Sequence, residues 1–312
     1  MKLATFMAER GAVALGAVSA DESVVVDLQR AHEQLKRGRT LSLESMQALI
    51  ESGAEGIGLV RQLAEAAPDE CRYPLADLRL LAPLPEPPQI RDFLCFEEHL
   101  KNAFAQAAKL SGQEQREVPA VWYQQPIYYK ANRFSVNGPD CDVVWPSYSQ
   151  LMDYELELAC VIGTGGRDIP REEAASHIFG YTVFNDASAR DAQVIEMTGQ
   201  LGPAKGKDFD TGNVFGPWIV TADELSDPYG LEMVARVNGE EWSRGNSSSM
   251  HHRFDDLIAF VSRAETLHPG EILGSGTVGT GCGLEQGRYL SSGDVVELEI
   301  EGIGVLRNRF VR

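Results

Sequence analysis

The 312-residue sequence lacks the features that mark membrane proteins and disulfide-rich proteins. No apolar run approaches the roughly 20 residues that a membrane-spanning helix requires. Cysteine is scarce: the chain has five cysteines, which are scattered and form no C-x-x-C pair. This pattern argues against a disulfide framework and against a zinc site, and it fits the reduced thiols of a cytoplasmic protein. We therefore expect a cytoplasmic location and no membrane partner.

Positive charge is also in short supply. The chain has 28 Lys and Arg residues against 46 Asp and Glu residues, which gives a formal net charge of −18 at pH 7. A strongly acidic protein repels the phosphates of nucleic acids and of anionic membrane surfaces, so both are excluded as partners. A small anionic substrate is still compatible with this charge, because a few local Arg or Lys side chains or a bound metal can override the global field.

A proline-rich stretch divides the chain. Four prolines fall within the six residues 83–88, and such a run can continue neither a helix nor a central strand. We expect a small N-terminal α+β domain (1–84) and a larger catalytic domain (85–312), since the length allows one large and one small domain.

The predicted N-terminal domain contains strand and helix signals but no chemistry. Segments 2–8, 12–19 and 24–28 have the composition of short strands separated by turn residues. Ser42 is a candidate N-cap for the helix that follows. Packing and dimer contacts are the roles that we expect for this part.

The larger domain opens its motifs with Asp153–Ile162, a segment of β-forming residues that ends at a run of glycines. Glu155 and Glu157 lie two positions apart, and on a strand such residues face the same way. Two adjacent buried carboxylates are costly unless a cation pairs them, and Mg²⁺ or Ca²⁺ accepts carboxylate oxygens. On this spacing alone, a half-exposed strand with both side chains in water is the commoner arrangement.

A similar spacing near the C-terminus provides a comparison. Glu297, Glu299 and Glu301 also lie two positions apart, and apolar residues alternate with them. No companion ligand accompanies these residues. We interpret them as the solvent face of an edge strand, not as a metal site.

Two further segments decide how Glu155 and Glu157 are interpreted. Phe184–Gln193 reads F-N-D-A-S-A-R-D-A-Q, and Gly206–Trp218 reads G-K-D-F-D-T-G-N-V-F-G-P-W. With the E-x-E strand, they resemble the fumarylacetoacetate hydrolase superfamily, whose patterns are E-x-E, N-D-x-[ST]-A-R-D-x-Q and [GA]-K-x-F-D-T-x-x-x-x-G-P. The resemblance covers about residues 85 to 312. It implies a mixed α+β, β-rich fold with a rolled mixed β-sheet and short helices.

The resemblance also implies roles for individual residues. The expected ligands of one divalent metal are Asp92, Glu155, Glu157 and Asp186. His99 is implied as the base that activates water, and Lys207 as the cation that stabilises the developing oxyanion. The residues expected to contact the substrate are Tyr129, Arg190, Gln193, Gly276 and Thr277.

The surroundings of His99 depart from one pattern of the family. The shorter acylpyruvases and related decarboxylases carry H-x-x-E, in which the Glu is the partner of the His. Here the third residue after His99 is Asn102, so that pair is absent. The acid that orients His99 must come from elsewhere in the chain, and Glu285 is one candidate.

The resemblance implies a metal-dependent hydrolase that cleaves a C–C bond in a 1,3-diketo acid, either an acylpyruvate or a fumarylacetoacetate, in the breakdown of aromatic compounds. Mg²⁺ is the expected cofactor, with Mn²⁺ or Ca²⁺ as alternatives, and a homodimer is the expected assembly. One rival function is a decarboxylase, or an isomerase or hydratase, that acts on 2-oxo acids. The missing Glu after His99 counts against decarboxylation. The other rival is a non-catalytic metal-binding protein.

Overall fold

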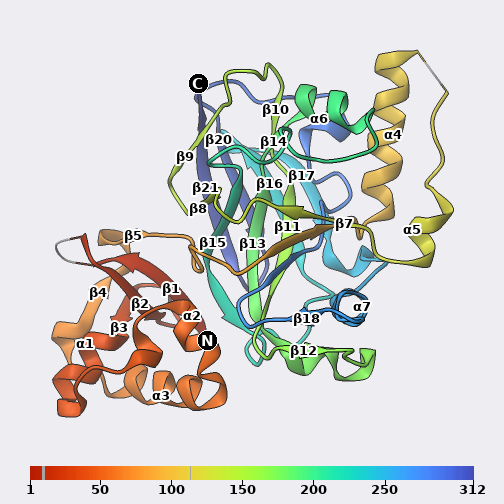
Figure 1. The fold of residues 1–312 in the computed structure, drawn as a ribbon. Coiled ribbons are helices and arrows are strands. Elements are labelled where there is room, and N and C mark those ends of the chain that lie inside the picture. The colour runs from red at the N-terminus through yellow and green to blue at the C-terminus, as the bar shows by residue number, and fades with distance from the viewer. Residues whose placement is uncertain (9–10, 113) are drawn as a thin grey trace.

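The computed structural model describes residues 1–8, 11–112 and 114–312. Figure 1 shows the N-terminal elements, in red and orange, gathered at one side of a larger β-rich body. The N-terminal strands are β1 (Lys2–Met7), β2 (Val13–Val18), β3 (Val24–Asp27), β4 (Arg72–Pro74) and β5 (Arg79–Leu80). The helices between β3 and β4 are α1 (Leu28–His32), α2 (Met46–Glu51) and α3 (Gly53–Ala66).

The larger part is built mainly of strands. These are β6 (Ile90–Phe93), β7 (Tyr128–Ala131), β8 (Val136–Asn137), β9 (Asp142–Val144), β10 (Met152–Asp153), β11 (Leu156–Ile162), β12 (Gly166–Arg167), β13 (Ile178–Asp186), β14 (Ser188–Ala189), β15 (Asn213–Thr221), β16 (Glu232–Val237), β17 (Glu240–Asn246), β18 (Thr266–Leu267), β19 (Ile272–Gly274), β20 (Val295–Ile300) and β21 (Gly304–Val311). Its α-helices are α4 (Glu97–Ser111), α5 (Ala120–Gln124), α6 (Arg190–Met197), α7 (Phe254–Val261) and α8 (Gly283–Gln286). Within the described ranges, no helix is both long enough and apolar enough to cross a bilayer.

The three strands predicted near the N-terminus are confirmed, but the predicted helix cap is wrong. Ser42 lies in a 3₁₀ turn, Leu41–Leu43. The cap of α2 is Ser45, whose side chain accepts a hydrogen bond from the backbone N–H of Ala48. Both serines precede the same apolar helix face, so the hydrophobic spacing did not distinguish them.

One large mixed sheet forms the centre of the protein. Its strands stand in the order β4-β3-β2-β1-β15-β13-β11-β19-β6-β7, with β5 beside β1 and β8 beside β15. Most neighbours are antiparallel, but β19 and β6 are parallel, as are β15 and β8. Every residue of β11 and β15 is buried. Alternate residues of β11 join hydrophobic clusters on opposite faces of the sheet, which explains the continuous apolar run in its sequence.

The N-terminal strands belong to this same sheet. β1 pairs with β15, so that Lys2 lies opposite Val220 and Leu3 opposite Ile219. The boundary expected at residues 84 and 85 falls between β5 and β6. The sheet crosses that boundary, and the division into two domains stays a prediction.

A second sheet of five strands, in the order β17-β16-β20-β21-β9, packs on the larger body. The alternation predicted around Glu297 and Glu299 is confirmed, because Val296, Leu298 and Ile300 of β20 are buried. The edge position is wrong, since β20 pairs with β16 on one side and β21 on the other. The charged face of an interior strand here meets solvent, as antiparallel sheets allow.

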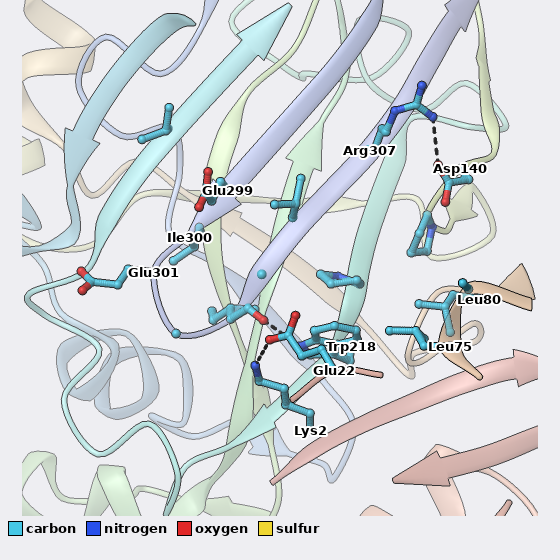
Figure 2. A pocket seen from close by; sticks show the side chains of 18 of the residues that line it. Lys2, Glu22, Leu75, Leu80, Asp140, Trp218, Glu299, Ile300, Glu301 and Arg307 are labelled. Atoms are coloured by element: carbon cyan, nitrogen blue, oxygen red, sulfur yellow. Dashed lines mark hydrogen bonds and ion pairs between the residues drawn. The ribbon is translucent and has the colours of Figure 1, made fainter. Parts of the chain in front are cut away.

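A hollow of about 720 Å³ lies where the N-terminal part meets this second sheet. Figure 2 shows its side chains, among them the ion pair of Lys2 with Glu22 and that of Arg307 with Asp140, 3.1 Å long. None of the residues expected to bind the metal, to act in catalysis or to contact the substrate lines this hollow. The acidic motifs therefore meet elsewhere, inside the large sheet.

Candidate active site

Three acidic side chains meet within the large sheet. Asp92 lies on β6, Glu157 on β11 and Asp186 at the end of β13, and one oxygen of each lies within 4.8 Å of the others. The intervening strand β19 carries Gly274 at this level, where a Cβ would stand 2.6 Å from Asp92 Oδ1 and 3.0 Å from Glu157 Oε2. Glycine thus makes room for the two carboxylates to meet across the strand. We call these three residues the acidic cluster.

Burial and repulsion raise the pKa values of the acidic cluster. Burial raises the pKa of Asp92 and of Glu157 well above the ordinary values, and a neighbouring acid adds to each shift. Burial also raises the pKa of Asp186 to about 6, although Lys207 opposes that shift. Each change keeps like charges from accumulating in a site of low dielectric constant.

The acidic cluster fits a hard divalent cation. Its donors are all oxygens, and all three side chains are buried. Glu157 Oε1 and Asp186 Oδ1 have no hydrogen-bond partner within the described part of the chain. Buried oxygens without partners are costly, and a cation that takes oxygen ligands would satisfy both of them.

Glu155 lies next to the acidic cluster, but the strand predicted to hold it is wrong at its start. β10 ends at Asp153 and β11 begins at Leu156, while Glu155 forms an isolated bridge with Cys282. Glu155 therefore stands directly before β11, and its backbone pairs with Cys282.

Two cations hold the carboxylate of Glu155. Its Oε2 lies 2.5 Å from Lys207 Nζ, and its Oε1 lies 2.7 Å from Arg190 Nη1. Burial alone would raise the pKa of Glu155, but Arg190 and Lys207 outweigh burial and lower it. The role of Glu155 as a metal ligand stays a prediction.

Lys207 connects Glu155 to the acidic cluster. Its Nζ lies 2.5 Å from Asp186 Oδ2 and donates to Ser188 Oγ at 2.7 Å. Burial would lower the pKa of Lys207, but Asp186 and Glu155 raise it, so the ammonium group keeps its charge. The side chain is buried and does not reach solvent, and its catalytic role stays a prediction.

Glu196, which the sequence analysis did not single out, holds the loop before Lys207. The Glu196 carboxylate accepts the backbone N–H groups of Ala204, Lys205 and Gly206 at 2.8 to 2.9 Å. These bonds shape the turn that delivers the lysine. Glu196 lies on α6 after the recognised motif, and only the tertiary contact reveals its function.

His99 finds its acidic partner far away in the sequence. The histidine is buried in the first turn of α4, and its Nδ1 lies 2.8 Å from Glu285 Oε1 on α8. The side chain of Asn102 donates to Glu285 Oε2 at 2.8 Å, and the N–H of Thr280 donates to the same oxygen at 2.7 Å. Asn102, one turn after His99, therefore does not supply the acid itself but binds Glu285, the acid that α8 supplies.

Asp153 links this pair to Arg190, and the sequence analysis missed it. The Asp153 carboxylate is fully buried and accepts the N–H groups of Gly283 and Leu284, at 2.8 and 2.9 Å. Arg190 Nε donates to the same carboxylate at 2.9 Å. One side chain thus positions both the start of the helix that carries Glu285 and the guanidinium group of Arg190.

The residues expected to contact substrate lie around the acidic cluster. The hydroxyl of Tyr129 donates to Asp186 Oδ2 at 2.7 Å, whereas the Tyr128 ring packs on a phenylalanine of β6. Gln193 Oε1 accepts a hydrogen bond from Arg190 Nη1 at 3.0 Å. Tyr129, the tyrosine expected to contact the substrate, therefore reaches the cluster, while its role toward a substrate stays a prediction.

The glycine loop after β19 covers another side of the cluster. The N–H of Gly276 points between Asp92 Oδ1 and Glu157 Oε2, at 3.2 and 3.1 Å. Gly276 has a φ of 75°, a conformation that favours glycine. Thr277 is buried next to it. The structure therefore brings the predicted loop to the site, while its role toward a substrate stays a prediction.

Comparisons with known proteins agree with this arrangement. The family model described as "Fumarylacetoacetate (FAA) hydrolase C-terminal" matches residues 89–311. The human mitochondrial oxaloacetate tautomerase FAHD2A is 34% identical over 274 residues, which cover 86% of this chain and 80% of that protein. Oxaloacetate tautomerase YisK of Bacillus subtilis (strain 168) is 33% identical over 300 residues, which cover 93% of each chain.

Solved structures share the fold over the whole chain. A fumarylacetoacetate hydrolase from psychrophilic Exiguobacterium antarcticum has a TM-score of 0.77 and 29% identity, and the match covers 100% of this chain and 99% of that one. Maleylpyruvate hydrolase from Sphingobium sp. SYK-6, in complex with manganese(II) and pyruvate, has a TM-score of 0.74 and 25% identity, with the same coverage. The predicted β-rich α+β fold is confirmed, and the chain belongs to the fumarylacetoacetate hydrolase family.

Proposed function

We propose that this chain is a metal-dependent tautomerase that interconverts the enol and keto forms of oxaloacetate or of a similar small 2-oxo dicarboxylate. The observation that carries the proposal is the likeness to two oxaloacetate tautomerases, one of them matched over 93% of each chain. The site supports the same chemistry, because a buried acidic cluster and a histidine–glutamate pair serve a proton transfer next to a carbonyl group. The isomerase, a rival in the sequence analysis, thus moves ahead of C–C hydrolysis.

The acidic cluster would hold the cation, with Glu155 and Lys207 next to it. Mg²⁺ is the first choice and Mn²⁺ or Ca²⁺ the alternative, since each accepts oxygen ligands. When bound, the cation supplies a Lewis acid for the oxygen on C2, where negative charge develops as the enol and keto forms interconvert.

His99 would move the proton at C3. In ketonisation the enol hydroxyl releases its proton to solvent, its electrons re-form the C2 carbonyl, and the C2–C3 π pair takes a proton from Nε2 of the imidazolium form of the ring, which becomes neutral imidazole. A proton from water then restores the ring. Glu285 at Nδ1 orients the ring and leaves Nε2 for the transfer.

Charged and polar groups around the cluster would hold the substrate. Arg190 offers a planar guanidinium that suits a carboxylate, and Gln193 lies within 3.0 Å of it. Lys207 would stabilise the charge on the C2 oxygen as it develops. Tyr129, Gly276 and Thr277 would complete the contacts.

The decisive experiment follows the ketonisation of enol-oxaloacetate through the loss of its ultraviolet absorbance, with Mg²⁺, with Mn²⁺ and with a chelator. We expect a rate above the spontaneous one that the chelator and His99→Ala each abolish. Pyruvate release from acylpyruvates and CO₂ release from oxaloacetate are measured in parallel. Cleavage of acylpyruvates without ketonisation would identify a hydrolase, and no turnover of any substrate would favour the non-catalytic alternative.

Hydrolysis of a C–C bond is the second candidate function. Its support is the maleylpyruvate hydrolase solved with manganese(II) and pyruvate, which shares the fold at 25% identity. Both reactions place charge on a 2-oxo group next to a cation, and they differ in whether water attacks. Assembly as a homodimer and a cytoplasmic location stay predictions, and light scattering on the purified protein tests the first.

A further inference from the structure

Cys282, whose sulfur is a possible metal ligand, lies against His99 and Glu285. Its Sγ is 3.9 Å from His99 Nδ1 and 3.5 Å from Glu285 Oε1, and those two atoms are 2.8 Å apart. The Cys282 and His99 side chains are buried, and only 1% of the Glu285 side chain is exposed. A sulfur, a nitrogen and an oxygen donor therefore form a compact triangle, which we call the mixed-donor triad.

The triad has the dimensions of one face of a tetrahedral zinc site. Bonds to zinc are about 2.0–2.2 Å for nitrogen and oxygen and about 2.3 Å for sulfur. A tetrahedron with such bonds places neighbouring donors about 3.3–3.8 Å apart. The separations in the triad, from 2.8 to 3.9 Å, differ from this range by roughly half an ångström or less. Small side-chain movements would therefore close the site around an ion.

The fold, and not a sequence motif, assembles this triad. Cys282 is the N-cap of α8 and Glu285 lies in its first turn, while His99 comes from the first turn of α4, and the two helices pack against each other. The absence of a C-x-x-C pair argues only against a zinc site built from neighbouring cysteines. It does not bear on a site assembled from distant segments. Asp153 fixes the start of α8, so two of the three donors are held in place.

Donor chemistry separates the triad from the acidic cluster. The cluster offers oxygens alone, which suit Mg²⁺ and Mn²⁺, whereas thiolate and imidazole favour Zn²⁺. Burial raises the pKa of the Cys282 thiol, so the free protein keeps this group neutral and a bound metal ion must displace its proton.

We propose that His99, Cys282 and Glu285 form a second metal site, selective for Zn²⁺ over Mg²⁺, and that Zn²⁺ bound there inhibits the enzyme. The inhibition rests on the proposed function, because it follows from the capture of His99 and Glu285, which the proton transfer requires. The binding itself does not depend on the reaction. A zinc site next to the cation site would make the activity respond to the supply of free zinc.

Binding is tested with Co²⁺ on the full chain kept in excess Mg²⁺, because Co²⁺ accepts tetrahedral sites and a thiolate ligand gives it a near-ultraviolet charge-transfer band. We expect the band in the wild type, its loss in Cys282→Ser and Cys282→Ala, and its displacement by Zn²⁺. Cys141→Ser is the matched control, since Cys141 is more exposed and distant from the triad in sequence and contacts. Absence of the band, or its persistence in both Cys282 variants, would overturn the proposal.

Inhibition is tested separately by ketonisation in excess Mg²⁺ with buffered Zn²⁺. We expect the Zn²⁺ concentration for half inhibition to rise at least about tenfold in Cys282→Ser, the loss of one ligand out of three, and to stay unchanged in Cys141→Ser. Equal inhibition of wild type and Cys282→Ser would refute the inhibitory role. A cobalt band without any ketonase activity would keep the metal site and refute the proposed function alone. Thermal melts confirm that each variant is folded.

Discussion

The charge state of the acidic cluster predicts that Glu157→Gln changes the free energy of unfolding differently with and without bound metal. Two full charges no more than 4.8 Å apart repel by at least about 3.5 kcal/mol at an effective dielectric constant of 20. The metal-free protein avoids this cost by holding protons, since burial and Asp92 raise the pKa of Glu157. Glutamine resembles the protonated acid, so we expect the free energy of unfolding without metal to change by no more than about 1 kcal/mol.

With metal, the same substitution removes a charged ligand. Mg²⁺ at about one hundred times its dissociation constant stabilises the wild type by about 2.7 kcal/mol. We expect this gain to disappear in Glu157→Gln at the same Mg²⁺ concentration. Urea unfolding in EDTA and in MgCl₂ measures both numbers. Glu299→Gln is the matched control, because Glu299 has the same E-x-E spacing but is 42% exposed and pairs with Arg236. A Glu157→Gln protein that keeps the full gain would refute a cation at the cluster.

Three further predictions concern the same site. Glu285→Gln should lower the turnover number for ketonisation about 10–100-fold with little change in KM, because the substitution leaves His99 without its orienting charge. Steady-state kinetics measure this, and an unchanged turnover number would contradict the proposed pair. Gly274→Ala should weaken Mg²⁺ binding about tenfold or more, because the added Cβ would stand 2.6 Å from Asp92 Oδ1. Calorimetry measures the affinity, and an unaltered value would show that the carboxylates can move apart freely. As the pH falls through about 6, the metal-free protein should gain stability, since Asp186 with its raised pKa takes up a proton that the unfolded chain does not yet bind. Mg²⁺ affinity should fall over the same pH range, because the proton competes with the cation. Stability that changes with pH in the same way with and without metal would refute this assignment.

The sequence predicted the parts of the site that adjacent residues encode. Strand alternation and the family motifs located Glu157, Asp186 and Lys207, and the structure brings them together with Asp92. The start of the central strand was mispredicted because the bridge of Glu155 to Cys282 interrupts it. No periodicity within a strand reports a contact with a segment more than a hundred residues away.

The parts that sequence reasoning missed all depend on contacts between distant segments. Asp153 accepts a hydrogen bond from the start of α8, and Glu196 accepts one from Gly206, ten residues further along the chain. Glu285 was named as a candidate partner of His99, but only the contact between them shows the pairing. The interior place of β20 likewise follows from its two neighbours and not from its own alternating pattern, which an edge strand shares.

The pairing of β1 with β15 has a consequence for anyone who dissects this protein. The family match begins at residue 89, which invites expression of the C-terminal portion alone. Such a truncation would strip β1 from β15 and leave the backbone groups of Ile219 and Val220 bare at an apolar rim. Exposed edge strands pair with the strands of other chains, so the shortened protein should precipitate or form soluble aggregates even though every residue of the site is retained.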